Sequence, residues 1–169
     1  MMKLLRYIFL ASFCLILTVA AADDGQSPFK LTQLEGEWEG TGMFLMPVTH
    51  IKMDIVGQAT FTYDSADHYL RTAITGTKFI FTYSDSGKLI RDPVTDSISW
   101  EVWDNFGKHA KYYGTIDDGV IRGTRTKGNK TYSVAIDLVS SDTIDFRLTQ
   151  TNADSSSFDR AVFHLWRVE

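Results

Sequence analysis

Several residue types are scarce in this sequence of 169 residues, and each shortage excludes a class of protein. The single cysteine, Cys14, can form neither an intramolecular disulfide nor a cysteine-ligated metal site. The formal net charge of −4 provides no positive excess for binding nucleic acid, so we expect no such partner. No apolar run reaches the length of about 18 residues that a membrane-spanning helix needs, so we expect no stable membrane insertion. A composition of 44% hydrophobic and 22% charged residues excludes a disordered or collagen-like chain.

The first 22 residues are typical of a secretory signal peptide. A basic start precedes an uncharged, mostly apolar run, Ile8–Ala22, which ends in three alanines. We therefore expect residues 1–22 to be removed and residues 23–169 to form one domain that is periplasmic or secreted. Cys14 would leave with the signal peptide. The alternative is a lipid anchor on Cys14, which the bulky Phe13 before it disfavours.

The rest of the chain alternates between apolar and polar residues with a period of two, which predicts β-strands. Turn signals rich in Asp, Asn, Ser and Gly separate these segments. Among them, Thr75-Gly76 and Ser84–Gly87 are interpreted as turns, and residues 27–34 could form one helical turn. The pattern predicts about ten antiparallel strands, at 36–46, 50–63, 67–75, 77–83, 96–104, 109–116, 119–126, 131–138, 143–151 and 157–168.

Short hairpins between consecutive strands indicate an all-β, up-and-down meander. About ten such strands would close into a single antiparallel β-barrel, because closure removes the exposed edges of an open sheet. A sandwich of two sheets is the alternative arrangement. The chain has no linker, repeat or low-complexity segment, so we expect one domain.

One specific motif opens the first predicted strand. It is Leu34-Glu-Gly36-Glu-Trp38-Glu-Gly40-Thr-Gly42. Glycine weakens a strand and packs nothing, so this spacing indicates a sharp bend at which Trp38 closes one end of a barrel. The motif resembles the Gly-x-Trp signature of the lipocalin and calycin superfamily. Its longer form looks like that of nitrobindins and of uncharacterised exported bacterial lipocalin-like proteins.

The resemblance implies a small barrel with a central cavity. It assigns structural roles to Gly36, to Trp38 and to Arg167, which looks like the lipocalin arginine that lies over the tryptophan of the first strand. Nitrobindins bind haem through a histidine in the last strand, so the resemblance makes His164 a candidate axial ligand. The register argues against this role, because the family's ligand lies further from the final arginine. We therefore expect no haem and no other cofactor.

No catalytic motif is present in the sequence. The four histidines lack metal-ligand spacing, so no metal site is predicted. The chain contains neither Gly-x-Ser-x-Gly nor a glycine-rich phosphate loop, so no catalytic residue is assigned. The basic run 122–127 is interpreted as the solvated end of a hairpin.

Residues that could line a pocket are mostly aromatic. The candidates for the inward face are Phe79, Phe81, Tyr83, Trp100, Tyr112, Tyr132, Phe146 and Phe158. On the last strand His164 alternates with Phe158, Arg160, Val162 and Trp166, which would give one face a cation and an imidazole. An apolar cavity with a few polar groups is typical of a small-molecule site. The expected ligand contacts are Tyr69, Arg71, Trp100, Arg160 and His164.

The sequence therefore favours an exported lipocalin-like barrel that binds a small apolar or amphipathic molecule. One alternative is that the aromatic side chains simply fill the barrel. A second is a calycin-type isomerase or lyase that uses Arg160 and His164 as its acid–base pair. The others are a haem-binding protein similar to nitrobindins and a small outer-membrane barrel. The last is disfavoured by uniformly short loops and by the lack of a terminal aromatic residue. The oligomeric state and the identity of the ligand are left open.

Overall fold

A computed structural model describes residues 29–46, 50–79 and 81–169. The expected signal peptide, residues 1–22, lies outside the described residues. The described chain contains one short 3-10 helix, η1 (Leu31–Leu34), within the segment expected to form a helical turn. Ten strands follow it: β1 (Gly36–Leu45), β2 (Lys52–Asp64), β3 (Tyr69–Lys78), β4 (Phe81–Arg91), β5 (Ser97–Asp104), β6 (His109–Asp117), β7 (Val120–Lys127), β8 (Lys130–Ser140), β9 (Thr143–Thr151) and β10 (Ser157–Arg167).

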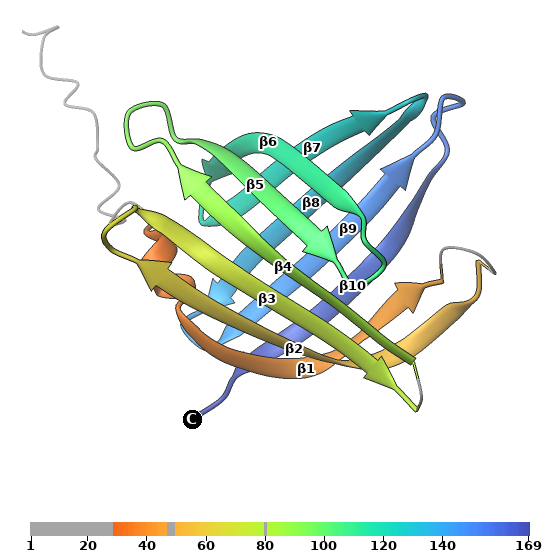
Figure 1. Cartoon of the computed structure of the whole chain (residues 1–169), viewed down its shortest axis with the longest axis horizontal. Coiled ribbons are helices and arrows are strands. Elements are labelled where there is room, and N and C mark those ends of the chain that lie inside the picture. Colours follow the sequence, from red (N-terminus) through yellow and green to blue (C-terminus); the bar gives the residue numbers. More distant parts are fainter. Residues whose placement is uncertain (1–28, 47–49, 80) are drawn as a thin grey trace, which may run out of the picture.

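The ten strands form a closed antiparallel barrel (Figure 1). Each strand pairs with the next one in the chain, and β10 pairs with β1 to close the cylinder, so that Trp38 lies opposite Arg167. The predicted all-β, up-and-down barrel is therefore confirmed, and the alternative of a two-sheet sandwich is wrong.

The alternating sequence pattern sets the two faces of the wall. Along β2, Ile55, Ala59 and Phe61 are buried inside the barrel, whereas Gln58 and Thr60 between them are exposed. An antiparallel strand with one buried and one solvated face has this pattern, because successive side chains point to opposite sides. The core is thus the interior of the barrel.

One end of the barrel is closed by η1 and the start of β1. Trp38 is 1% exposed, and its Nε1 donates a hydrogen bond to the Leu34 carbonyl oxygen at 2.9 Å. The Arg167 guanidinium lies 4.2 Å from the centroid of this indole, within cation–π range. It also donates to the carbonyl oxygens of Gln33 and Glu35, so it joins both ends of the described chain.

Gly36 leaves room for this arginine. Its φ of +130° lies in a region that residues with a Cβ rarely adopt. A Cβ at this position would also lie 2.6 Å from a terminal nitrogen of Arg167. Glycine is therefore required by both the backbone and the neighbouring side chain.

Two predicted turns are instead parts of strands. Thr75-Gly76 lies in β3 and Ser84–Gly87 in β4, so the predicted strand 77–83 was wrong and the strand there spans Phe81–Arg91. Gly76 and Gly87 both face the interior of the barrel. A Cβ on Gly87 would lie 2.7 Å from the Glu101 carbonyl oxygen. Glycine is therefore needed at these positions because neighbouring atoms leave no room for a side chain, and not because the chain turns there.

The hairpins divide between the two ends of the barrel (Figure 1). Hairpins β1–β2, β3–β4, β5–β6, β7–β8 and β9–β10 turn at the right-hand end in this view, which we name the open end. The turns β2–β3, β4–β5, β6–β7 and β8–β9 lie at the other end, with η1 and the C-terminus. The interior near the open end contains the cavity described next.

Candidate functional site

A cavity of about 200 Å³ occupies the open half of the barrel. It is lined by Phe44, Tyr83, Asp85, Val102, Asp104, Phe106, Lys108, Ala110, Tyr112, Arg125, Lys127, Tyr132, Leu148 and Arg160. A deeper cavity of about 50 Å³ shares several of these residues and adds Trp100, Phe146 and Phe163. The site is therefore apolar at depth and carries charged groups nearer the mouth.

Asp85 provides a buried carboxyl group inside the barrel. It follows Tyr83 on the inner face of β4, and the Tyr83 hydroxyl donates a hydrogen bond to Oδ2 at 3.1 Å. The other oxygen, Oδ1, is buried and has no hydrogen-bond partner. Burial raises the pKa of Asp85 to about 7, the hydrogen bond from Tyr83 opposes this rise, and the nearby Asp104 carboxylate adds to it. At neutral pH this carboxyl is thus poised between its charged and neutral forms.

Arg125, on β7, provides a cation in the same cavity. Its guanidinium lies 5.2 Å from the ring centroid of Tyr112 and 4.7 Å from that of Tyr132, so it is held by cation–π contacts. Its Nε is buried without a hydrogen-bond partner. Burial raises the pKa of the Tyr112 hydroxyl, and the positive charge of Arg125 partly offsets that rise.

Asp85 Oδ1 and Arg125 Nε stand out among the described side chains, because they are the buried polar atoms that lack a hydrogen-bond partner. Such atoms are rare in folded proteins, since leaving one unpaired costs about 1–3 kcal/mol. Both residues line the same cavity. A bound polar group could satisfy them.

Arg160 enters the cavity through a β-bulge. The pairing of β10 with β9 shifts between Asp159 and Ala161, and the extra residue, Arg160, lines the cavity. One of its terminal nitrogens donates to the side-chain oxygen of Gln150 at 3.3 Å. A bulge re-aims side chains because it interrupts the regular alternation of the strand.

Because of this bulge, the side chains that β10 directs to the interior differ from those that we expected. Beyond the bulge Phe163 and Leu165 are buried, whereas His164 and Trp166 point outward. His164 hydrogen-bonds to the Asp145 carboxylate on the outer surface. The prediction that Arg160 and His164 share one face is therefore wrong.

Two other expected contacts lie outside the cavity. Arg71 is exposed on the outer face of β3, where its guanidinium pairs with Asp64 at 3.1 Å. Tyr69 lies on the same face, and its ring is covered by the Lys88 ammonium group at 3.8 Å from the centroid. Neither residue lines either cavity. A role for them in ligand contact stays a prediction.

Trp100 faces the interior, as expected. It is 2% exposed, lines the deeper cavity and packs edge-on against Phe146. Its Nε1 donates to the Thr72 hydroxyl at 3.2 Å. Phe79, by contrast, was wrongly expected inside; it is 93% exposed in the β3–β4 turn. Among the other expected inward aromatics, Tyr83, Tyr112, Tyr132 and Phe146 line the cavities, Phe81 packs on the core and Phe158 is half-buried.

Asp85 and Arg125 were missed by the sequence analysis. Asp85 lies in the segment Ser84–Gly87, which was interpreted as a turn, and Arg125 lies in the basic run interpreted as solvated. The signal that could have identified Asp85 is the unbroken alternation from Phe81 to Leu89, with every second residue facing inward.

The described part of the chain also limits other kinds of site. No histidine lines the cavities. Over residues 29–46, 50–79 and 81–169, no group of three or more His, Cys, Asp and Glu side chains is placed to hold a metal ion. In the same residues, no helix is both long enough and apolar enough to cross a membrane.

Comparison with known proteins identifies the fold. No protein-family model matches the sequence, and no curated protein matches it. The structure is similar to that of Rv2717c from M. tuberculosis, with a TM-score of 0.61 and 17% sequence identity, covering 82% of this chain and 95% of that one. It is also similar to a DUF3598-family protein of unknown function from Nostoc punctiforme, with a TM-score of 0.54 and 14% identity, covering 83% of this chain and 49% of that one. These similarities concern the fold alone, which is a closed barrel of ten antiparallel strands.

Proposed function

We propose that this protein binds a small amphipathic molecule in the open half of its barrel. The observation that carries the proposal is the pair of buried, unpartnered polar atoms, Asp85 Oδ1 and Arg125 Nε, in one aromatic cavity. A binding site that is mostly apolar, with a few placed polar groups, has this composition. A ligand group that hydrogen-bonds to both atoms would remove their desolvation cost.

The cavity favours a ligand with an acceptor or anionic head. Arginine and lysine side chains outnumber carboxylates among its lining residues, and Asp85 is half protonated near neutral pH. The head would lie between Asp85 and Arg125. The apolar part would point toward Trp100 and Phe146 in the deeper cavity.

The volume favours a small ligand. Sites for drug-sized molecules typically measure about 300–1,000 Å³. The main cavity measures about 200 Å³ and the deeper one about 50 Å³. We therefore expect a compact molecule, such as an aromatic or short aliphatic acid, rather than a large lipid.

Matched probe molecules test this proposal. Phenylacetate, phenylacetamide and phenethylamine have the same apolar body and differ in the charge of the head. Calorimetry should show the tightest binding for phenylacetate and the weakest for phenethylamine. Arg125→Met should weaken phenylacetate binding by at least ten-fold, because a hydrogen bond to a charged group contributes about 1.5–3 kcal/mol.

The control is Arg122→Met, on the same strand but exposed on the outer face. It should leave the affinity unchanged. Native mass spectrometry of protein purified from its own source should in addition show a retained small molecule. The proposal fails if no such molecule is retained and no probe binds, or if the two arginine variants weaken binding equally.

The other functions expected from the sequence have less support. The acid–base pair Arg160 and His164 is split between the inside and the outside of the barrel, so that isomerase or lyase mechanism is not proposed. Haem binding through His164, as in nitrobindins, is not proposed for the same reason. An outer-membrane barrel needs an apolar outer band, whereas the outward residues of β2 include Lys52, Asp54 and Gln58.

We further propose that the protein is an exported member of the lipocalin-like barrels. The Gly36 and Trp38 motif supports the family assignment, and the composition of residues 1–22 supports export. Amino-terminal sequencing of the protein from its source should find the chain beginning near Asp23. A chain that retains residues 1–22 would contradict export by this signal.

A further inference from the structure

Charge is divided between the two ends of the barrel. Among the described residues, the turns at the closed end and the strand residues that flank them carry seven aspartates against one arginine: Asp64, Asp67, Asp92, Asp96, Asp117, Asp118, Asp142 and Arg91. The corresponding positions at the open end carry five lysines against two aspartates: Lys52, Lys78, Lys108, Lys127, Lys130, Asp104 and Asp154. An acidic protein thus presents a basic rim around its cavity.

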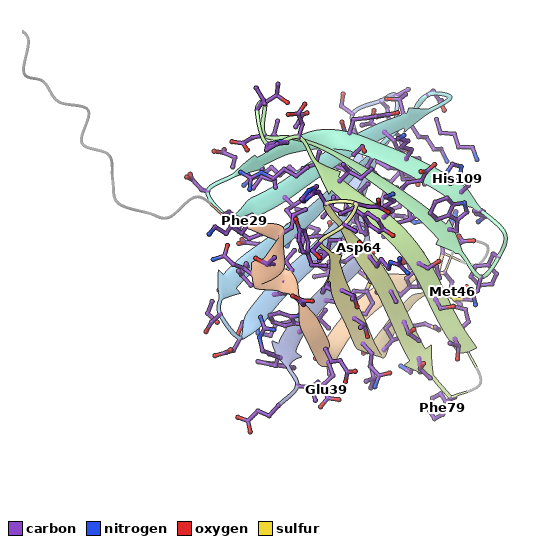
Figure 2. All side chains as sticks on the ribbon, turned by 60° about the vertical axis from the view of Figure 1, so that its left-hand side comes forward. Phe29, Glu39, Met46, Asp64, Phe79 and His109 are labelled. Carbon is purple, nitrogen blue, oxygen red and sulfur yellow. The ribbon has the colours of Figure 1, made fainter. Side chains whose placement is uncertain are left out.

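Apolar side chains project from the same rim. Phe79, at the turn of β3–β4, is 93% exposed and points away from the barrel at its lower end in Figure 2. Phe106, at the turn of β5–β6, is 51% exposed and stacks on Phe81 with the ring centroids 6.5 Å apart. Phe106 also lines the cavity, whereas Phe79 projects from the same end of the barrel outside the cavity lining.

The fold does not require a phenylalanine at position 79. Its φ of +53° is in the left-handed region, where glycine or asparagine is more stable. With 93% of its surface exposed, the ring also contributes little to the core. A residue that adds strain and buries almost nothing indicates an interaction outside the barrel.

We propose that the open end docks onto an anionic lipid surface. Aromatic side chains beside lysines are the composition that binds the membrane interface, because the rings enter the headgroup region while the ammonium groups pair with anionic lipids. The acidic closed end is repelled by the same surface, so the charge division fixes the orientation. Duplex DNA would match the lysines but would not explain the exposed rings, because its bases are already stacked on one another.

Docking in this orientation places the cavity mouth against the membrane. An amphipathic molecule could then pass between the bilayer and the site without crossing bulk water. The docking proposal does not depend on the proposed function, since it rests only on the rim.

Matched fluorescent labels test which end meets the lipid. In a Cys14→Ser background, Phe79→Cys and Val94→Cys each carry one environment-sensitive dye. Val94 lies in the β4–β5 turn at the closed end and is 89% exposed, so it matches Phe79 in exposure. Proteins that lack residues 1–22 should give the same two results, which separates docking of the barrel from any binding by the apolar run Ile8–Ala22.

With vesicles of phosphatidylcholine containing one-quarter phosphatidylglycerol, the dye at position 79 should shift to the blue and the dye at position 94 should not. Pure phosphatidylcholine vesicles should give a much smaller shift. Added salt should reverse the shift, because it screens the lysines. Equal shifts at both positions, or none at either, would overturn the proposal.

Charge reversal at the rim provides a second test of the docking proposal. Each lysine near an anionic surface contributes about five-fold to partitioning, the equivalent of ~1 kcal/mol. Lys52→Glu with Lys130→Glu, neither of which lines the cavity, should therefore weaken vesicle binding by at least about 25-fold. The control pair, Lys30→Glu with Arg122→Glu, makes the same change in net charge at the closed end of the barrel and should have a small effect.

Two results would point to a different partner and overturn docking on lipid. A shift at position 79 that grows with protein concentration without vesicles would indicate a second copy of the chain. A shift seen only with a protein extract and not with vesicles would indicate a protein surface.

Discussion

The raised pKa of Asp85 predicts that this carboxyl destabilises the folded protein as the pH rises. Its pKa is about 7 in the barrel, against 3.8 for an unburied aspartate. Between these two values the folded state binds a proton that the unfolded state has lost, so the free energy of unfolding falls as the pH increases. Above the folded pKa the cost is constant. The two pKa values correspond to a cost of at most about 4 kcal/mol.

Asp85→Asn should remove this cost. The amide keeps the size of the side chain and an oxygen that can accept the hydrogen bond from Tyr83. At pH 3 and below the variant and the parent protein should have similar free energies of unfolding, because the carboxyl is mostly neutral in both states there, roughly one pH unit below the unfolded pKa. The variant should then gain up to about 1.4 kcal/mol per pH unit until roughly pH 7, and be more stable by a few kcal/mol at pH 8.

Urea denaturation at a series of pH values measures this difference. The control is Asp92→Asn, in an exposed turn where backbone N–H groups of Val94 and Thr95 lower the pKa of the carboxyl. Its difference from the parent should be flat between roughly pH 5 and pH 8, since Asp92 is charged in both states over that range. If the Asp85→Asn difference is equally flat, the carboxyl is not buried as described and the reasoning is refuted.

Two further predictions concern the scaffold. Trp38→Ala should lower the free energy of unfolding by about 3–5 kcal/mol because it empties the closed end. His164→Ala, on the outer face, should lower it by less than about 1 kcal/mol. Urea denaturation measures both values, and a larger loss for His164→Ala than for Trp38→Ala would contradict the fold. Gly87→Ala should cost about 1–3 kcal/mol because the new Cβ meets backbone, and Gly76→Ala should cost less because its nearest neighbour is the flexible end of Ile55. If the two glycine variants have equal melting temperatures, the backbone beside Gly87 can move to make room for the new Cβ.

Much of the fold could be predicted because local pattern and global topology agree. In a meander every strand pairs with its neighbour in sequence, so the alternation of apolar residues and short turns is enough to indicate a closed barrel. The fourth strand was misplaced because Gly76 and Gly87 are typical turn residues. Their real role depends on Ile55, Thr72 and Trp100 across the interior, which no local signal reveals.

The site was harder to predict than the fold. One extra residue at the bulge reverses the alternation of β10, so the inward face expected for Arg160 is right, whereas the same face expected for His164 and Trp166 beyond the bulge is wrong. Arg160 was expected in the site and lines the cavity, but in company with Arg125 and Asp85 rather than His164. The register of β10 against β9 and the packing of side chains across the interior decided both outcomes. The sequence of a single strand carries no information about either.

The seam between β1 and β10 has a consequence for how the chain folds. Of the ten strand pairings in the described barrel, nine are hairpins between neighbours in sequence, and those can form as soon as each strand is available. The remaining pairing brings Trp38 opposite Arg167, almost the whole length of the barrel sequence apart, and cannot form until β10 has been synthesised. Until that pairing forms, β1 and the strand synthesised last each have an unpaired edge, at which chains can aggregate. β10 therefore completes the barrel, and removal of Trp166 and Arg167 at its end should impair folding more than a deletion of two residues in any turn.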